Sequence, residues 1–312
     1  MSEKVVVVGA GPVGTETALL LQQQGHEVVV VTRSGGGPQL EGVRRVAADA
    51  SDADVLTAQV QGASALVNCA NPADYTKWEQ VWPPLAASLL SAAERTGATW
   101  VSASSLYAYG PVDGPMVEGM PDRATDHKGR LRAGMWAEAL RLHRAGRIHA
   151  VEVRASDYLG PRVGANGHIP RHVPAAVRGK AARVIGRPDL PHTWTDVGDV
   201  ARALVAVAQQ PASWGRVWHA PSNPPRTQRE ALTDVLASIG KPPVPVRGTP
   251  AWLLSALARV NPVVRELDEM SYIFRRPYVM ESTRSQDELG LAPTPWPDVC
   301  RRTAEGNRGT PG

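Results

Sequence analysis

The sequence has little cysteine and no long apolar run. Its two cysteines, Cys69 and Cys300, cannot form a disulfide framework, and Cys69 lies in an apolar run typical of a buried strand, so we expect a reducing compartment. No apolar run approaches the roughly 18 residues that a membrane span needs. The first residues carry neither the basic region nor the small-residue cleavage site of a secretion signal. We therefore expect a cytoplasmic protein with no membrane partner.

A large excess of one charge is also missing. The chain has 34 basic and 30 acidic residues, only five of the basic ones are lysines, and no stretch concentrates lysine and arginine. A nucleic-acid-binding protein would gather its positive charge in a stripe, so we expect no nucleic-acid partner. With 43% hydrophobic and 21% charged residues, the composition excludes disordered, collagen-like and disulfide-scaffold proteins, and 312 residues suggest about two domains.

Continuous apolar runs alternate with helical patterns in the first half of the chain. Such runs, rich in β-branched residues, are typical of buried parallel strands joined by crossover helices. They predict strands at residues 5–8, 28–31, 43–47, 65–69, 99–103 and 148–153. The helical patterns predict helices at residues 15–24, 53–60, 75–96 with an interruption at Pro83 and Pro84, and 128–145. The predicted fold class is α/β, a Rossmann-type doubly wound parallel sheet with a smaller, mainly C-terminal lobe.

The second half has shorter, more isolated strands and more proline and glycine. It predicts helices at residues 197–209, 227–239, 251–260 and 262–274. We expect residues 1–157 to form the Rossmann domain, with residues 193–210 returning to it. Residues 158–192 and 211–300 are predicted to form a substrate-binding lobe. Residues 301–312 are expected to be a flexible tail, because most of them are small, polar or glycine.

Gly9, Gly11 and Gly14 form the pattern G-x-G-x-x-G directly after the first predicted strand and at the start of the first helix. Gly9 permits a tight turn, Gly11 lets the backbone approach a pyrophosphate, and Gly14 lets the helix pack close to the strand. The helix N terminus, which Pro12 and Val13 open, offers N–H groups and a favourable dipole. In this setting the motif predicts dinucleotide binding, the alternative being a purely structural turn.

The end of the second predicted strand distinguishes NAD from NADP. An acidic residue there would bind the ribose 2′-OH of NAD, but this chain has Thr32, Arg33 and Ser34. An arginine beside two hydroxyls suits a 2′-phosphate, which it can bind through bidentate, charge-assisted hydrogen bonds. We therefore expect NADP(H) as the cofactor and residues 1–157 as an NADP-binding domain. The alternative is that Arg33 is a solvated loop residue.

Several further segments follow the predicted strands in a familiar order. Asp49 follows the third strand, Ala70 and Asn71 follow the fourth, and Ser156 follows the sixth. With the glycine loop, the stretch SASSLYAYG at 102–110 and HTWTDVGDVARAL at 192–204, they resemble the extended short-chain dehydrogenase/reductase superfamily of NAD(P)-dependent epimerases, dehydratases and reductases. The shorter glycine loop resembles its atypical branch. The resemblance implies that Asp49 lies near the adenine and that Ala70, Asn71 and Ser156 help to bind the cofactor.

The catalytic Tyr-x-x-x-Lys pair of that superfamily is missing. Residues 126–138, where the pair belongs, contain no tyrosine. Lys128 and Arg132 are four residues apart, so they share one helix face and could bracket the same ribose or phosphate. An alternative register would place Arg130 and Gly134 at these positions.

Three residues could carry the chemistry instead. The resemblance places Ser105 where the superfamily's serine or threonine orients the substrate oxygen. Tyr107, in a loop at the carboxyl end of a strand, is the first choice for the missing acid, the alternative being a tyrosine that packs under the cofactor. Lys128 is the other candidate acid or base, since a lysine near a cofactor pocket can have a shifted pKa. No histidine or cysteine spacing indicates a metal site, so we expect none.

The sequence therefore predicts an NADP-dependent oxidoreductase. It would transfer a hydride between the nicotinamide and a carbonyl or conjugated double bond of a small, fairly apolar substrate. Two alternatives stay open: a redox-neutral, sugar-type epimerase or dehydratase with tightly bound NAD(P), and a non-catalytic protein that senses NADP(H). The expected partner is a small-molecule substrate. A homodimer also stays open, because no feature of the sequence fixes the oligomeric state.

Overall fold

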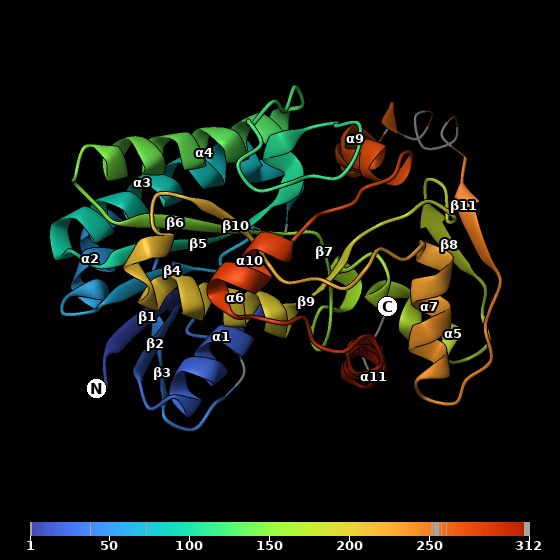
Figure 1. The fold of residues 1–312 in the computed structure, drawn as a ribbon, viewed down its shortest axis with the longest axis horizontal. Coiled ribbons are helices and arrows are strands. Elements are labelled where there is room, and N and C mark those ends of the chain that lie inside the picture. Colours follow the sequence, from blue (N-terminus) through green and yellow to red (C-terminus); the bar gives the residue numbers. More distant parts are fainter. Residues whose placement is uncertain are drawn as a thin grey trace.

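A seven-stranded parallel sheet forms the centre of the computed structural model, which describes residues 2–37, 39–72, 74–250, 252, 256, 258–259 and 261–308 (Figure 1). The strand order is β10-β6-β5-β4-β1-β2-β3, and every neighbouring pair is parallel. The strands are β1 (Lys4–Val8), β2 (Glu27–Thr32), β3 (Val43–Ala47), β4 (Ala65–Asn68), β5 (Thr99–Ser105), β6 (Ala150–Ala155) and β10 (Val217–His219). The chain runs outward in opposite directions from β1 and β4, so the loops after these two strands flank a crevice at the carboxyl edge of the sheet.

The strands bury alternate residues in two cores, one on each face of the sheet. Val5 and Val7 of β1 lie in the core that α1 and α6 cover. Val6 and Val8 lie in the opposite core, which α2, α3 and α4 cover, and Figure 1 shows these helices as layers on either side of the sheet. The helices are α1 (Pro12–Gln23), α2 (Ala53–Val60), α3 (Trp78–Thr96), α4 (His127–Arg144) and α6 (Val197–Gln209). Because both faces are covered, the strands carry continuous apolar runs.

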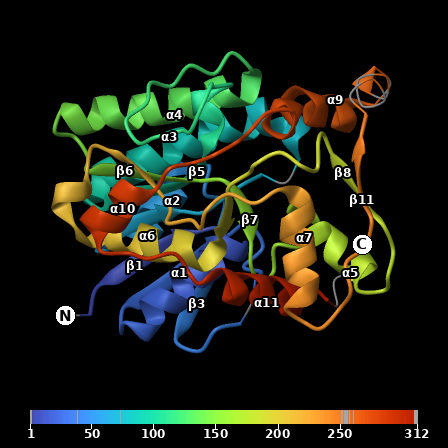
Figure 2. The same cartoon turned by 45° about the vertical axis from the view of Figure 1, so that its right-hand side comes forward.

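A smaller lobe lies beside the sheet and has its own core (Figure 2). It contains two pairs of parallel strands, β7 (Asp157–Leu159) with β9 (Trp194–Asp196) and β8 (Ala182–Ile185) with β11 (Val246–Thr249). Its helices include α5 (Val173–Ala176), α7 (Gln228–Ala237) and α11 (Trp296–Asn307). Two more helices, α9 (Pro262–Glu269) and α10 (Thr283–Leu289), connect the lobe with the sheet domain.

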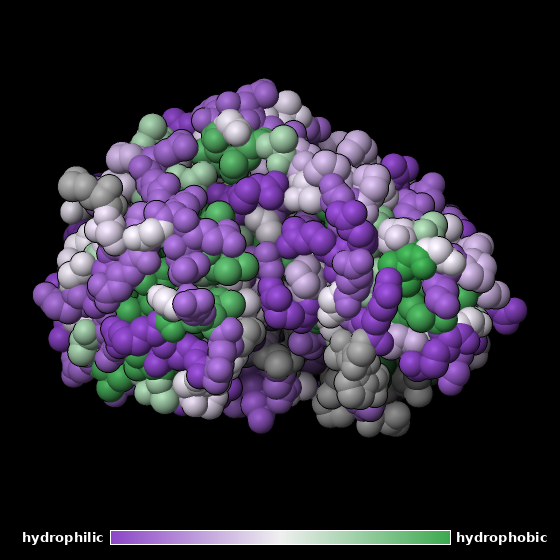
Figure 3. Space-filling view, turned by 90° about the horizontal axis from the view of Figure 1, so that it is seen from below, coloured by the Kyte–Doolittle hydropathy of each residue, from purple (hydrophilic) through white to green (hydrophobic). Residues whose placement is uncertain are grey.

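The outer surface is largely polar where the helices face solvent. Figure 3 shows hydrophilic side chains over most of the face seen from below, with apolar groups in patches between them. In the described part of the chain, no helix combines the length and the apolar character that a membrane span requires. Most of the buried apolar residues are gathered in the three cores.

The two parts share the chain differently from the predicted division. β10 pairs with β6 at the edge of the main sheet, so the prediction that all of residues 211–300 form the lobe is wrong. The predicted flexible tail is also wrong up to Asn307, because α11 continues to that residue. Thr303 and Asn307 are fully buried, and both hydrogen-bond to the backbone of Gly160. The small polar residues of the tail therefore serve as buried hydrogen-bond partners.

The predicted break in the third helix does not occur. α3 runs through Pro83 and Pro84, while Trp82 and Leu85 beside them are buried in the core. The packing of these side chains holds the helix although the two prolines lack N–H groups. The predicted helix at residues 251–260 falls largely outside the described residues.

Candidate functional site

The loop between β1 and α1 packs directly on the end of β4. Gly9 has a φ of +101°, and a Cβ at this position would lie 2.8 Å from the backbone nitrogen of Ala70. A Cβ on Gly14 would lie 2.1 Å from the carbonyl oxygen of Gly9, so α1 can approach β1 only with glycine there. A Cβ on Gly11, by contrast, would meet no described atom within 4 Å. The fold thus requires Gly9 and Gly14, whereas Gly11 borders open space.

The N terminus of α1 faces this open space. Gly11 is the N-cap residue without a side-chain cap, and Pro12 is the first helical residue. The N–H groups of Val13 and Gly14 in the first turn therefore lack acceptors within the helix, and the helix dipole adds partial positive charge. An uncapped helix start with room for close approach fits a pyrophosphate. The predicted residues Gly9 to Gly14 thus lie in one loop that can hold a dinucleotide.

The end of β2 carries the residues predicted to select the cofactor. The Thr32 hydroxyl donates a hydrogen bond at 3.1 Å, and the Ser34 hydroxyl accepts one at 3.2 Å, both with the backbone of the turn that follows. Arg33 lies exposed in this turn. Hydrogen bonds from the N–H and hydroxyl of Ser51 lower the pKa of Asp49, and the charge of Arg33 lowers it further. Arg33 and Asp49 therefore lie near one another at the same edge of the sheet.

The loop after β4 is held by a buried arginine of α4. The Asn68 side chain in β4 accepts a hydrogen bond from the Ala70 N–H at 3.1 Å. Asn71 accepts one from the Arg132 guanidinium at 3.0 Å, and this guanidinium lies 4.1 Å from the ring centre of Trp82. Arg132 thus positions the loop that carries Ala70 and Asn71.

Lys128 has different partners, on helix α9 of the later chain. Its ammonium nitrogen lies 2.5 Å from a carboxylate oxygen of Glu269 and also contacts Glu266, and its side chain is fully buried. Burial alone would lower the pKa of Lys128, but its hydrogen bonds with the two carboxylates raise the pKa above the ordinary value. The raised pKa holds the proton on Lys128, and its role as an acid or base stays a prediction. Lys128 bonds to α9 and Arg132 bonds to the loop after β4, and the predicted bracket around a ribose or phosphate stays a prediction.

Serine hydroxyls and a tyrosine gather at the carboxyl ends of β5 and β6. The hydroxyl oxygens of Ser104, Ser105 and Ser156 are buried and have no hydrogen-bond partner among the described residues. Ser105 pairs in register with Ala155, so Ser156 follows on the neighbouring strand. Tyr107 lies in the 3-10 turn after β5 and packs against both the α3/α4 core and the lobe core. Ser105 and Tyr107 thus lie between the two parts of the molecule, where such sheets bind ligands.

Tyr109 in the same turn belongs to a buried ionic network. Its hydroxyl lies 2.8 Å from Nε2 of His219, and the Arg154 guanidinium lies 4.5 Å from its ring centre. Arg154 hydrogen-bonds to Glu152 at 2.7 Å and to Asp122 at 2.5 Å. These contacts support β6 and the turn after β5. Sequence reasoning missed the network, because Asp122 and His219 come from distant loops and strands.

A buried carboxylate with two histidines lies on the lobe side. Oδ2 of Asp157 lies 2.6 Å from Nε2 of His192, and its Oδ1 lies 3.6 Å from Nε2 of His168. Burial lowers the pKa of His168 to about 4, so this ring is neutral near pH 7. The His192 ring stacks on Phe274 at 4.9 Å. Within the described ranges, no group of three or more histidine, cysteine or acidic residues could hold a metal ion.

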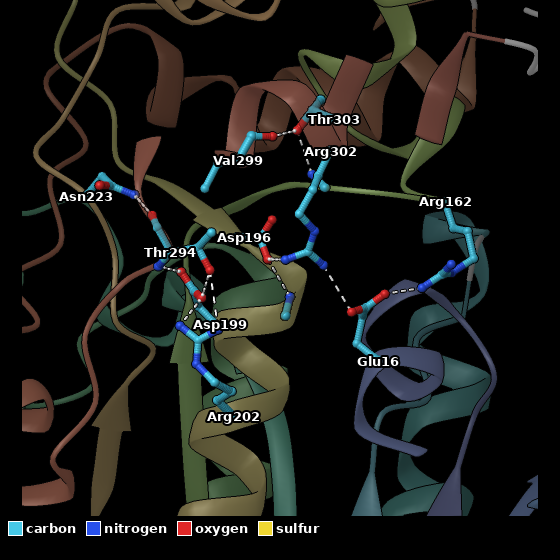
Figure 4. A network of polar contacts seen from close by, with 12 residues as sticks. Glu16, Arg162, Asp196, Asp199, Arg202, Asn223, Thr294, Val299, Arg302 and Thr303 are labelled. Atoms are coloured by element: carbon cyan, nitrogen blue, oxygen red, sulfur yellow. Dashed lines mark hydrogen bonds and ion pairs between the residues drawn. The ribbon is translucent and has the colours of Figure 1, made fainter. Parts of the chain in front are cut away.

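A second polar network, drawn in Figure 4, joins α1, α6 and α11. Glu16 of α1 accepts hydrogen bonds from Arg302 at 3.0 Å and from Arg162. Arg302 also donates at 2.9 Å to Asp196, the N-cap residue of α6. Burial raises the pKa of Asp196 to about 6. This network ties α11 to the helix that follows the glycine loop.

Comparison with known proteins agrees with this arrangement. The model of the NAD dependent epimerase/dehydratase family matches residues 5–219, and no curated protein matches the chain. A dTDP-glucose 4,6-dehydratase from Streptomyces venezuelae, solved with NAD and TYD bound, has 20% identity and a TM-score of 0.78 over 98% of this chain and 97% of its own. MoeE5 in complex with UDP-glucose and NAD has 21% identity and a TM-score of 0.77 over 98% of each chain.

A UDP-N-acetylglucosamine 4-epimerase from Methanobrevibacter ruminantium M1, in complex with UDP-N-acetylmuramic acid, has 15% identity and a TM-score of 0.80 over 98% of each chain. At such identities these structures show a shared fold. The family match extends from β1 through β10 and so includes the glycine loop, the end of β5 and the start of α4. The chain therefore belongs to the NAD dependent epimerase/dehydratase family.

Proposed function

We propose that the protein is an NADP-dependent reductase that adds a hydride and a proton to the carbonyl group of a small substrate. The open space at Gly11 carries the dinucleotide part of this proposal. The protein's own backbone fills the corresponding space at Gly9 and Gly14, whereas Gly11 leaves room beside an uncapped helix N terminus. A pyrophosphate is the group that such a helix start accepts.

The preference for NADP over NAD rests on the turn after β2. This turn offers no carboxylate to a ribose 2′-OH, and Arg33 is exposed within it. Its guanidinium can bind a 2′-phosphate in bidentate fashion. Exchange of Arg33 for aspartate would therefore reverse the preference for NADPH over NADH, and an unchanged preference would remove Arg33 from this role.

The residues around Ser105 and Tyr107 favour reduction of a carbonyl. A bound reduced nicotinamide supplies the hydride, which leaves this chain to orient the carbonyl and provide the proton. The buried Ser105 hydroxyl, without a partner among the described residues, can donate a hydrogen bond to the carbonyl oxygen. Tyr107 gives its phenol proton to that oxygen as the electron pair of the C=O bond moves there, and solvent then returns a proton to the phenolate. Lys128 stays ion-paired with Glu266 and Glu269, so we assign the proton transfer to Tyr107.

A redox-neutral epimerase or dehydratase is the second candidate. The family match favours it, as do similar folds solved with NAD and a nucleotide sugar. An enzyme of this kind would retain NAD(P) through purification and show no net consumption of NADPH. A non-catalytic sensor would bind NADPH tightly but would not consume NADPH, whichever substrate is added.

Titration of the purified protein with NADPH and NADH, followed by nucleotide fluorescence, tests the dinucleotide site. Gly11→Ala should weaken binding about tenfold or more, because its methyl group occupies the space that the pyrophosphate needs. Gly25→Ala is the control: Gly25 has a φ of +83° with no described atom within 4 Å of its Cβ position, so alanine strains the end of α1 and leaves the site intact. If neither NADPH nor NADH binds to the wild-type protein, the proposal is refuted.

Loss of the reduced nicotinamide absorbance across a panel of carbonyls and enones tests the reaction. We expect consumption with at least one carbonyl, and Tyr107→Phe should lower the turnover while NADPH still binds. Undiminished turnover would exclude Tyr107 as the proton donor. Cofactor retained on purification without any consumption would instead favour the redox-neutral enzyme.

A further inference from the structure

Two tyrosines of the lobe have buried hydroxyl groups that make no hydrogen bond within the described part of the chain. Tyr278 is 4% exposed, and Tyr272 is half-buried. Both hydroxyl oxygens are buried and lack a hydrogen-bond partner in the described part of the chain, and the same holds for Oδ2 of Asp126. Buried polar groups in native proteins are nearly always hydrogen-bonded, so three such atoms call for an explanation.

The fold brings these groups together from three separate segments. Asp126 caps α4 through its Oδ1, which accepts a hydrogen bond from the Gly129 N–H at 2.7 Å. Its Oδ2 takes no part in this cap. Tyr272 lies three residues after Glu269, whose carboxylate accepts the His127 N–H at 2.8 Å and so holds this turn against the start of α4. Tyr278 pairs through its backbone with the segment before β9. The start of α4 therefore meets the segment that carries Tyr272, and Tyr272 and Tyr278 pack in the same lobe core.

The pKa values of the two tyrosines are linked, and the carboxylate of Asp126 influences both. Burial raises the pKa of Tyr272 and of Tyr278, and the negative charge of Asp126 raises both further. Tyr272 adds to the rise at Tyr278, and both rings pack against the lobe core that Tyr107 contacts. Both phenols thus keep their protons at neutral pH.

We propose that Asp126, Tyr272 and Tyr278 form a subsite for a hydroxyl group next to the reacting carbonyl, so that the substrate is an α-hydroxycarbonyl compound. A hydroxyl can donate to Oδ2 of Asp126 while it accepts hydrogen bonds from the phenols. The subsite rests on the proposed function, because Ser105 and Tyr107 fix where the carbonyl lies.

The test compares pairs of carbonyl compounds that differ in one hydroxyl group. NADPH-saturated protein is assayed with hydroxyacetone against acetone and with 2-hydroxyacetophenone against acetophenone. We expect kcat/KM for the hydroxylated member to be about tenfold higher or more, because the unhydroxylated one leaves buried polar groups unpaired. Tyr272→Phe, Tyr278→Phe and Asp126→Asn should each reduce this preference about five- to tenfold while NADPH affinity stays unchanged. If the wild type has the same kcat/KM for the hydroxylated and the unhydroxylated compound, or turns over neither, the subsite is refuted.

The free protein provides a second readout that needs neither NADPH nor substrate. Because the hydroxyls of Tyr272 and Tyr278 have no partner among the described residues, Tyr272→Phe and Tyr278→Phe should leave the Tm unchanged or raise it by about 2–4 °C. Tyr109→Phe is the matched control, because its hydroxyl bonds to His219 at 2.8 Å and its loss should lower the Tm. If all three variants lower the Tm alike, the hydroxyls have structural partners and the subsite is refuted. Failure of the wild type to bind NADPH would overturn the proposed function. The Tm values of the three variants would then still test whether the hydroxyls of Tyr272 and Tyr278 lack structural partners.

Discussion

The free energy of unfolding of the wild type should fall as the pH rises through the pKa of Asp196. Replacement of Asp196 by asparagine should abolish this fall. The Asp196 side chain is fully buried at the N terminus of α6. Burial raises its pKa from 3.8 to about 6; the cation of Arg302 opposes this rise, and the negative charges of Asp199 and Glu16 add to it. The folded protein therefore binds this proton more tightly than the unfolded chain.

The size of the effect follows from the two pKa values. The protonated carboxyl stabilises the fold fully below a pH of about 3.8, and this contribution is lost as the pH rises through about 6. A difference of about two pKa units corresponds to about 3 kcal/mol in total. About 2 kcal/mol of this falls between about pH 4.5 and 7.5. The substituted asparagine could not titrate, but its side-chain oxygen could still accept the Gly198 N–H, which lies 2.7 Å from the native carboxylate.

Urea unfolding followed by tryptophan fluorescence, repeated from about pH 4.5 to 7.5, gives the free energy of unfolding at each pH. The variant should gain about 2 kcal/mol relative to the wild type across this range. Asp52→Asn makes the same exchange at the exposed cap of α2 and controls for the loss of a cap carboxylate. Parallel curves for Asp196→Asn and the wild type would refute the reasoning from burial.

Three other substitutions test contacts elsewhere in the fold. Arg154→Met leaves the buried Glu152 without its partner at 2.7 Å and should lower the free energy of unfolding by about 3–5 kcal/mol; a loss below about 1 kcal/mol in urea would contradict this. Asn307→Ala removes two buried hydrogen bonds, of 2.7 and 3.0 Å, to the loop after β7, and should cost about 2–3 kcal/mol and speed amide exchange there; unchanged exchange would mean that α11 does not hold the loop. Gly14→Ala would bring a Cβ within 2.1 Å of the Gly9 carbonyl and should destabilise the protein by about 3 kcal/mol or more, and a thermal unfolding curve like that of the wild type would disprove the close packing.

The sheet domain could be predicted because its elements carry local signals. β3, α2 and α6 occupy the predicted residues 43–47, 53–60 and 197–209. The two helices show apolar patterns that no distant contact has to complete, and β3 carries two β-branched residues, Val43 and Val46. β10 has only three residues and becomes part of the sheet through pairing with β6, so its place depends on a contact that the sequence does not express.

The candidate site divides in the same way. The glycine loop is local, and the structure places its residues as the motif requires. The partners of Lys128, in contrast, lie 138 and 141 residues further along the chain. Spacing within α4 showed that Lys128 and Arg132 share a helix face, but not that one holds α9 and the other the loop after β4.

The ion pair of Lys128 changes the meaning of the missing Tyr-x-x-x-Lys motif. A lysine that is buried and bound to two carboxylates at the start of α4 connects the sheet domain to α9, and the chain leads from α9 directly to Tyr272. The same contact therefore holds the segment that carries Tyr272 against the start of α4, which Asp126 caps. For this reason the proton donor and the specificity groups should be sought at the junction of β5, α4 and the lobe rather than on α4 alone.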